Sequence, residues 1–219
     1  MSERVIVVVG AGPGVGASVA RRFGQEGYSV VLLSRDAVGL GQLSAALQAD
    51  GIDAAWTDVD VTDDVALHRA VNEAGERFGR IDVLHFNPSA FRQKDPLALT
   101  PDELLEDLRL GVGALLVAVQ AARPFMPVGG RVTATGSMAA DRPWNEAASL
   151  GVQKAGLRNL VRSIDATLEQ HGIRAVSVTV NGTLAPGTPF APEHVADALF
   201  AAACQDISAW RAEVSFDGG

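Results

Sequence analysis

A glycine-rich turn between an apolar segment and a helix-patterned segment constrains this chain more than any other feature. Residues 5–9 read VIVVV, and residues 10–16 read GAGPGVG. Glycines in that place leave backbone N–H groups bare at a helix N-terminus, where they bind a pyrophosphate. The turn therefore predicts a dinucleotide site, against the simpler alternative of a tight turn alone. Its expected contacts are Gly10, Gly12, Gly14, Val15 and Gly16.

Short apolar runs alternate with longer helix-patterned stretches along the rest of the chain. That alternation is typical of right-handed β-α-β units on a parallel sheet, so we expect an α/β, doubly wound fold. Strands are expected near residues 4–9, 29–34, 53–58, 81–86, 130–136, 173–180 and 212–216. Helices are expected near residues 14–26, 38–50, 63–78, 101–126, 146–170 and 192–205. No spacer or change of composition divides them, so we expect one domain over residues 1–219.

The balance of charge limits the kinds of partner. The chain has 18 Lys and Arg against 26 Asp and Glu, which gives a formal charge of −8. Such a surface repels phosphate backbones, so nucleic acid is not an expected partner. The expected partner is a small-molecule substrate, as the candidate functions below require. His68, His171 and His194 are scattered without ligand spacing, and we expect no metal site.

Apolar segments and the single cysteine bear on the compartment. No secretory signal pattern precedes residue 5 and no apolar run approaches 18 residues, so we expect a protein that is neither exported nor membrane-spanning. Cys204 cannot form an internal disulfide, which fits a reducing cytoplasm. In its apolar surroundings Cys204 is expected to be a small buried residue.

A basic residue follows the second expected strand, where the cofactor's ribose would lie. A carboxylate at that point grips the 2′-hydroxyl of NAD, whereas an arginine accommodates the 2′-phosphate of NADP. The chain has Ser34 and Arg35 there, which favours NADP(H) over NAD(H). The alternative is a solvated arginine paired with Asp36.

The expected helices at 101–126 and 146–170 are apolar on more than one side. Thr100, Pro101 and Glu103 form a cap and capping box that start the first of them. Helices of this kind bury one face on the sheet and need a second apolar neighbour. We therefore expect a homodimer or homotetramer, with an internal location in a thick monomer as the alternative.

Further segments, read with the glycine turn, match one known family. Gly10, Gly14 and Gly16 have the spacing Gly-x-x-x-Gly-x-Gly, and the other matching segments are residues 60–63, 80–84, 120–126 and 214–219. From residue 4 onward the chain thus resembles the short-chain dehydrogenase/reductase family. The resemblance implies a Rossmann-type sheet of about seven strands in the order 3-2-1-4-5-6-7, flanked by helices in three layers. It also implies that Asp60 and the amide of Val61 hold the adenine.

The resemblance also implies a catalytic set of Asn, Ser, Tyr and Lys, of which this chain keeps two members. Ser137 follows the fifth expected strand, and Lys154 keeps the lysine position, where it also hydrogen-bonds the nicotinamide ribose. The tyrosine position is Leu150 and the asparagine position is Gly111. Because the family's tyrosine transfers the carbonyl proton, an oxidoreductase with non-standard acid–base chemistry is implied.

Two segments that face the cofactor in the family are altered as well. Residues 86–89 read FNPS and keep Asn87 alone of the family's two asparagines. Gly182 remains a cofactor contact, but Asn181 replaces the usual proline before it. Only residues 183–191 then precede the next expected helix, where the family has a lid over the substrate.

Several polar residues are candidate substitutes for the missing acid. Residues 141–146 include Asp141, Arg142, Asn145 and Glu146, which a solvated turn explains equally well. His85 is expected to be a satisfied core residue, and Ser149 to point away from the site because one helical residue turns by about 100°.

Three functions remain open from the sequence. The first is an NADP(H)-dependent oxidoreductase acting on a small or medium carbonyl, alcohol or activated double bond. The second is an NADP(H)-binding protein without redox turnover, serving as a sensor or a partner subunit. The third is a non-redox isomerase or cyclase on the same fold. Ser137 and Lys154 at family spacing place the oxidoreductase first.

Overall fold

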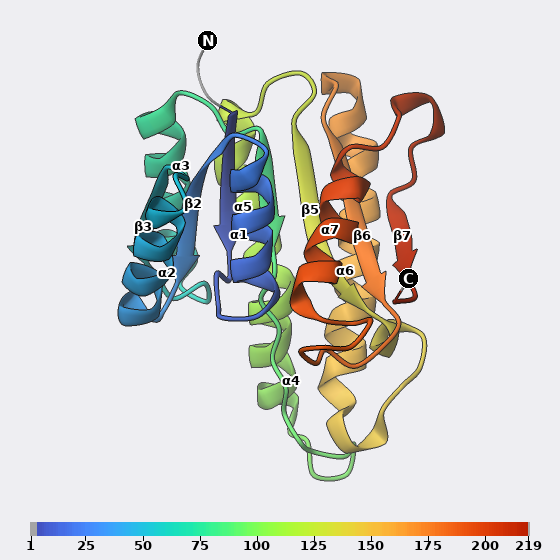
Figure 1. Cartoon of the computed structure of the whole chain (residues 1–219). Coiled ribbons are helices and arrows are strands. Elements are labelled where there is room, and N and C mark those ends of the chain that lie inside the picture. The colour runs from blue at the N-terminus through green and yellow to red at the C-terminus, as the bar shows by residue number, and fades with distance from the viewer. Residues whose placement is uncertain (1–3, 219) are drawn as a thin grey trace.

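The chain folds around one parallel sheet, which the computed structural model describes over residues 4–218. Its seven strands lie in the order β3-β2-β1-β4-β5-β6-β7, and neighbouring strands pair in parallel (Figure 1). The Rossmann-type fold and the strand order are therefore confirmed, and a single domain stays a prediction. The strands are β1 Arg4–Val9, β2 Tyr28–Ser34, β3 Ala54–Asp58, β4 Val83–Phe86, β5 Arg131–Ser137, β6 Arg174–Val180 and β7 Glu213–Phe216.

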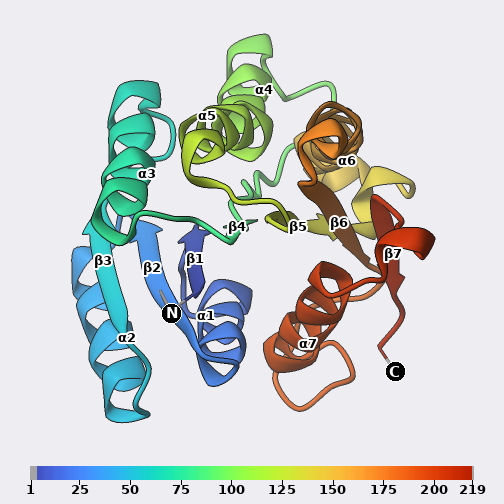
Figure 2. The ribbon, with the colours of Figure 1, turned by 90° about the horizontal axis from the view of Figure 1, so that it is seen from above.

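Helices cover both faces of the sheet, as the view from above shows (Figure 2). Helices α1, α2 and α7 lie on one face, and α3, α4, α5 and α6 lie on the other. None of the helices within residues 4–218 has the length and apolarity needed to span a bilayer. The α-helices are α1 Val15–Gln25, α2 Ala37–Ala49, α3 Asp64–Phe78, α4 Pro101–Leu108, α5 Ala114–Ala122, α6 Ala148–Leu168 and α7 Pro192–Ala203.

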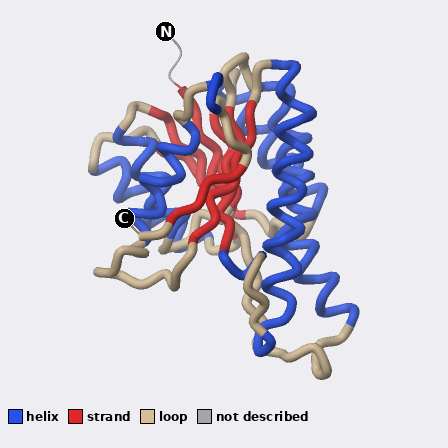
Figure 3. Tube along the Cα trace, turned by 90° about the vertical axis from the view of Figure 1, so that its right-hand side faces the viewer, coloured by secondary structure: helices blue, strands red, loops and turns tan. Residues whose placement is uncertain are grey.

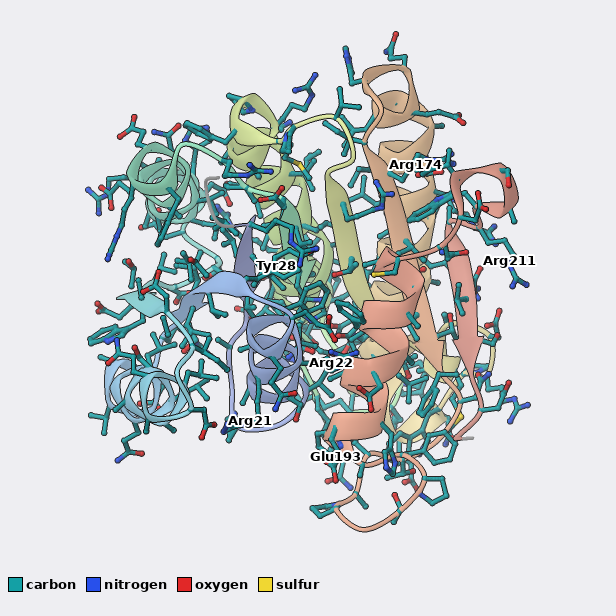
Figure 4. All side chains as sticks on the ribbon, turned by 45° about the horizontal axis from the view of Figure 1, so that its top comes forward. Arg21, Arg22, Tyr28, Arg174, Glu193 and Arg211 are labelled. Carbon is teal, nitrogen blue, oxygen red and sulfur yellow. The ribbon has the colours of Figure 1, made fainter. Side chains whose placement is uncertain are left out.

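Strand β1 explains why the first apolar run has no polar alternation. Val5, Val7 and Val9 pack in the core under α3, α5 and α6, whereas Ile6 and Val8 pack under α1 and α7. Helices cover both faces of the strand over residues 5–9, so all five of these side chains are buried and apolar. On the α1 face the two neighbouring helices are also joined by an ion pair, because the Arg22 side chain lies between α1 and α7 and donates to Asp197 at 2.8 Å (Figure 4).

The prediction of one regular helix over residues 101–126 is wrong. It starts at Pro101 with the expected Thr100–Glu103 capping box, but residues Arg109–Gly113 form a π-helical turn between α4 and α5. Two of these five residues are Gly111 and Gly113, and glycine weakens a regular helix. Such π-turns occur as insertions within longer helices, so the backbone continues from α4 to α5 in one direction.

The prediction that Cys204 is buried is wrong. Helix α7 ends at Ala203, and Cys204 is the C-cap residue, exposed to solvent. Its neighbours Ala202 and Ala203 are buried. Because the helix ends there, the cysteine leaves the apolar face that the preceding residues share.

Helices α4 and α6 extend beyond the sheet on one side. The edge-on view shows them continuing past the carboxyl ends of the strands, together with the loops that join them to the sheet (Figure 3). The carboxyl edge of a doubly wound sheet is where ligands bind. The overhanging helices therefore form one wall of the region in which a site is expected.

Candidate functional site

A cleft of about 630 Å³ crosses the carboxyl ends of β2, β1, β4, β5 and β6. From β2 to β5 it spans three strand spacings, or about 14 Å. It brings together most of the site residues expected from the sequence, and only Gly16 and Asp60 are absent from its lining. Those present are Gly10, Gly12, Gly14, Val15, Ser34, Arg35, Val61, Asn87, Ser137, Lys154 and Gly182.

The glycine turn forms a bare cradle at the start of α1. Gly10 has φ +83°, a conformation that L side chains rarely adopt, and side chains at Gly12 and Gly14 would project into open space. Gly14 is the N-cap residue and provides no side-chain cap. Within residues 4–218 the N–H groups of Gly14 and Val15 have no acceptor. An anionic phosphate fits such a helix N-terminus.

Gly16 has a different part in the same turn. A Cβ atom there would lie 2.5 Å from the Gly10 carbonyl oxygen. Real Cβ atoms do not approach that closely, so only glycine lets α1 pack directly against the end of β1.

Arg35 lies at the β2 end of the cleft with its side chain 68% exposed. Its guanidinium is 3.8 Å from the Asp60 carboxylate. The alternative pairing with Asp36 is not formed, because the Asp36 carboxylate caps α2 by accepting from the Gly39 N–H at 3.0 Å. Arg35 is therefore a largely exposed cation beside Ser34, within reach of an anion in the cleft.

Asp60 lies in an adjoining hollow, which shares Arg35 with the cleft. Its carboxylate accepts from the Thr62 N–H at 2.9 Å and from the Thr62 hydroxyl at 2.8 Å. These hydrogen bonds lower the pKa of Asp60. The carboxylate is thus held by its own loop, and Val61 is the residue of that loop that lines the cleft.

Asn87 joins three strands at the middle of the cleft. Its backbone N–H donates to the Val9 carbonyl at 3.0 Å, and its side-chain amide donates to the Gly10 carbonyl at 3.1 Å. Its side-chain oxygen accepts from the Thr135 hydroxyl at 2.9 Å. With all these partners in place, the asparagine fixes the spacing between the glycine turn, β4 and β5.

Ser137, Leu150 and Lys154 lie together at the β5 end. The Ser137 Oγ accepts from the Ala139 N–H at 3.2 Å, which leaves its hydroxyl proton for another acceptor. Lys154 Nζ donates to the Thr135 carbonyl at 2.9 Å, and no carboxylate among the described residues forms an ion pair with it. Burial lowers the pKa of Lys154 to about 8. Such an amine exchanges a proton near neutral pH.

The candidate substitute acids do not line this end of the cleft. None of residues 141–146 lines the cleft, and the Asp141 carboxylate accepts from Arg158 at 2.6 and 2.7 Å. His85 is fully buried, its Nδ1 lies 2.9 Å from the Thr133 hydroxyl, and burial lowers its pKa to about 3. Ser149 is also buried and donates to Asp107 at 2.6 Å.

Sequence reasoning missed the polar contacts that build the wall opposite the strands. The Gln153 carboxamide is bonded to Ala90, and the Asp107 carboxylate accepts from Arg92 at 3.0 and 3.1 Å. Gln153 and Asp107 are buried polar residues on helices, and no spacing rule marks them. Their partners become evident only in the folded chain, since Gln153 contacts a residue 63 positions away and Asp107 contacts one 15 positions away.

Comparison with known proteins gives consistent results. A family model described as short chain dehydrogenase matches residues 4–194. Cis-4-hydroxycyclohexanecarboxylate dehydrogenase of Sinomonas cyclohexanicum is 30% identical over 90% of this chain and 88% of that protein. The A-factor type gamma-butyrolactone 1'-reductase (1S-forming) of Streptomyces virginiae is 31% identical over 201 residues, which cover 90% of this chain and 76% of that protein.

Solved structures share the fold as well. A metagenomic short-chain oxidoreductase in complex with NADP superposes with a TM-score of 0.87 at 27% identity, covering 98% of this chain and 97% of the other. A dehydrogenase/reductase from Sinorhizobium meliloti 1021 superposes with a TM-score of 0.91 at 23% identity, covering 100% of this chain and 95% of the other. The second likeness shows the fold alone.

Proposed function

The chain belongs to the short-chain dehydrogenase family of oxidoreductases, and from that premise we propose that it uses NADP(H) in preference to NAD(H) to reduce or oxidise a small or medium carbonyl, alcohol or activated double bond. One observation carries the proposal. Ser137 and Lys154 line the same cleft as the bare amides of the glycine turn. A dinucleotide bound along the cleft would therefore extend from the α1 N-terminus to these two side chains.

The NADP(H) preference is supported at the β2 end. Arg35 is a mostly exposed cation beside Ser34, the Asp36 carboxylate caps α2, and the Asp60 carboxylate at 3.8 Å is held by Thr62. A guanidinium binds a phosphate through charge-assisted hydrogen bonds. The metagenomic short-chain oxidoreductase that was solved in complex with NADP, at 27% identity, also supports this preference.

The acid–base chemistry rests on two residues. When bound, the nicotinamide supplies or accepts a hydride, so reducing a carbonyl requires one proton from elsewhere. The Ser137 hydroxyl can donate a hydrogen bond to the substrate oxygen, and the Lys154 ammonium holds a proton that its lowered pKa makes available. Leu150 has no proton to give, so we assign the proton transfer to the Ser137–Lys154 end of the cleft.

A second candidate is a cofactor-binding protein without redox turnover. Leu150 favours it, because this side chain lines the cleft at the position where the family pattern has its tyrosine. A general acid contributes typically about 10²–10⁴-fold to a rate. Loss of the tyrosine alone would thus leave a slow enzyme, and further changes around the site would leave only binding.

A binding titration and a turnover assay separate the two candidates. Intrinsic fluorescence quenching measures the Kd of NADPH and NADH, and absorbance of NADPH follows turnover on ketones, quinones and conjugated enones. For the oxidoreductase we expect turnover that Ser137→Ala lowers about 100-fold with the Kd of NADPH unchanged. Ser163→Ala is the matched control, since its hydroxyl is exposed and bonds within α6. Tight NADPH binding without turnover on any of these classes would favour the binding protein.

A further inference from the structure

Gln153 is a fully buried glutamine whose carboxamide forms hydrogen bonds with one backbone segment. It precedes Lys154 on α6 and is 0% exposed. Its Oε1 accepts from the Ala90 N–H at 3.0 Å, and its Nε2 donates to the Ala90 carbonyl at 3.0 Å. The Ser89 hydroxyl adds a longer bond to Oε1 at 3.4 Å. Both polar ends of the side chain are therefore used to hold residues 89 and 90.

The space occupied by this carboxamide is the space that a side chain at position 111 would need. A Cβ atom on Gly111 would lie 2.5 Å from Gln153 Oε1 and 3.1 Å from its Cδ. The first distance is shorter than real Cβ atoms reach. Gly111 and Gln153 are thus a matched pair, because the glycine in the π-turn makes room for the glutamine from α6.

The segment that Gln153 holds is a wall of the cleft. Asn87, Pro88 and Ser89 all line the cleft. At its other end the segment is joined to the glycine turn, since Asn87 donates to the Gly10 carbonyl and Pro88 packs closely over Gly10. A continuous set of contacts thus runs from the glycine turn, through residues 87–90, to the residue beside Lys154.

A separate anchor holds the same loop farther along. Arg92 is bonded to the buried Asp107, and the Ala148 N–H donates to the Lys94 carbonyl at 3.1 Å. The loop would therefore remain attached to α4 and α6 without the Gln153 bonds. What Gln153 adds is the position of residues 88–90, next to the Ser137–Lys154 end of the cleft.

We propose that Gln153 is a positioning residue, which holds Ala90 and so sets the cleft wall of residues 88–89 against Lys154, at the end that takes the nicotinamide and the substrate. It acts through Ser89 and Ala90 and does not itself line the cleft. The assignment rests on the proposed function, because it assumes a dinucleotide whose nicotinamide half lies at this end.

Ligands of two lengths test the assignment. NADPH reaches both ends of the cleft, whereas 2′,5′-ADP lacks the nicotinamide half. Gln153→Leu removes both bonds to Ala90 at similar volume. We expect it to raise the Kd of NADPH about tenfold and to leave the Kd of 2′,5′-ADP within about twofold. Gln153→Glu, which keeps an acceptor for the Ala90 N–H, should recover part of the loss. Gln170→Leu, on an exposed glutamine beyond the end of α6, is the control.

An equal rise in the Kd of NADPH and of 2′,5′-ADP would mean a general structural role for Gln153 and would overturn the assignment. An unchanged Kd for both ligands would overturn it as well. Wild-type protein that binds neither ligand would instead overturn the proposed function. If Gln153→Leu does not fold, Gln153→Ala, which leaves room for water to reach the Ala90 backbone groups, takes its place in the same pair of titrations.

A double-mutant cycle tests the matched pair without any ligand. Gly111→Ala should lower the thermal midpoint of the wild type, because the new methyl group meets Gln153 Oε1. In the Gln153→Ala background the obstruction is gone, so the same change should shift the midpoint by less than half as much. Shifts of the same size in the two backgrounds would show that positions 111 and 153 are not coupled.

Discussion

Leu150 and Lys154 lie one turn apart on α6, and both side chains line the cleft beside Ser137. The apolar side chain and the buried amine thus present one helix face to the same space. The cleft has further apolar lining at Leu110 and Leu184. The proposed function assigns proton transfer at this end of the cleft to Ser137 and Lys154, because the Leu150 side chain has no proton to give.

Leu150→Tyr places a phenol in that wall. We expect less than about a tenfold gain in the rate of NADPH-dependent reduction of ketones. The reason is that the neighbouring wall has Gly111 where the family pattern has an asparagine, with the Gln153 carboxamide beside it. The measurement is NADPH absorbance under saturating cofactor. Leu150→Phe, which has the ring without the hydroxyl, is the control. A gain near the full 10²–10⁴-fold of a general acid would show that only the acid was missing.

Lys154 should make stability depend on pH in a defined direction. Its pKa is lowered from 10.5 to about 8 in the folded protein, so the unfolded chain binds the proton more tightly. The cost to folding is complete below about pH 8, and it is relieved as pH rises toward 10.5, where the unfolded chain binds more protons. Stability from this residue therefore increases with pH across that window.

Lys154→Met removes this dependence. At pH 7 we expect the variant to unfold with a free energy up to about 3 kcal/mol above that of the wild type, less the cost of leaving the Thr135 carbonyl without its donor. Urea titrations between pH 7 and 10 measure the difference, which should shrink above pH 8. A difference that stays constant over this range would contradict the lowered pKa.

Arg35→Ala should narrow the preference for NADP(H). We expect the Kd of NADPH to rise about tenfold and that of NADH to change less than about twofold, because one charge-assisted contact to the 2′-phosphate is lost. Fluorescence titration at constant ionic strength measures both. Arg211→Ala is a control of equal charge, since Arg211 lies beside β7 at the far edge of the sheet (Figure 4). Equal affinities for the two cofactors in the wild type would show the preference to be wrong.

Asp107→Ala should destabilise the fold strongly. Its carboxylate is 4% exposed and accepts from Arg92 and Ser149. We expect a loss of about 3 kcal/mol in the free energy of unfolding, because the loop of residues 87–100 loses its buried ionic anchor. Glu106 is another partner of Arg92, but the Glu106 side chain is 68% exposed. Glu106→Ala should therefore lower the free energy of unfolding by less than about 0.5 kcal/mol. Similar losses in the two variants would show that burial of Asp107 does not matter.

We expect helices α4, α5 and α6 to form the interface between subunits of a homodimer or homotetramer. Leu105, Leu116 and Val152 are 62%, 42% and 47% exposed on α4, α5 and α6. We expect light scattering to give two or four times the 22.8 kDa of one chain, and Leu116→Arg to shift the mass toward the monomer. Val38→Arg, at an apolar residue that is 72% exposed on α2 across the sheet, is the control. A monomeric wild type at micromolar concentration would contradict this prediction.

The fold could be predicted because its signals are local. The run at residues 5–9, the glycines that follow it and the repeated alternation of strand and helix each act within a few neighbouring residues. They determined the strand order and the place of the cleft once the family pattern was added. Ser137 and Lys154 could be placed the same way, since each follows a known element at fixed spacing.

Other features depended on residues that meet only after folding. Cys204 leaves the core because α7 ends one residue before it. The helix expected over 101–126 contains a π-turn at the place where Gly111 faces α6. Neither the end of a helix nor its close approach to a neighbour is written in the periodicity of apolar residues.

The amino-acid sequence by itself thus determined the class of fold, the glycine cradle and the positions of Ser137, Leu150 and Lys154 along it. The tertiary structure decided that Gln153 bonds Ala90, a residue 63 positions away in the chain, and that Gly111 leaves room for it. The physical reason is range. Backbone conformation and amphipathic pattern arise from near neighbours, whereas a buried carboxamide finds its partners only when two distant segments pack together and exclude water.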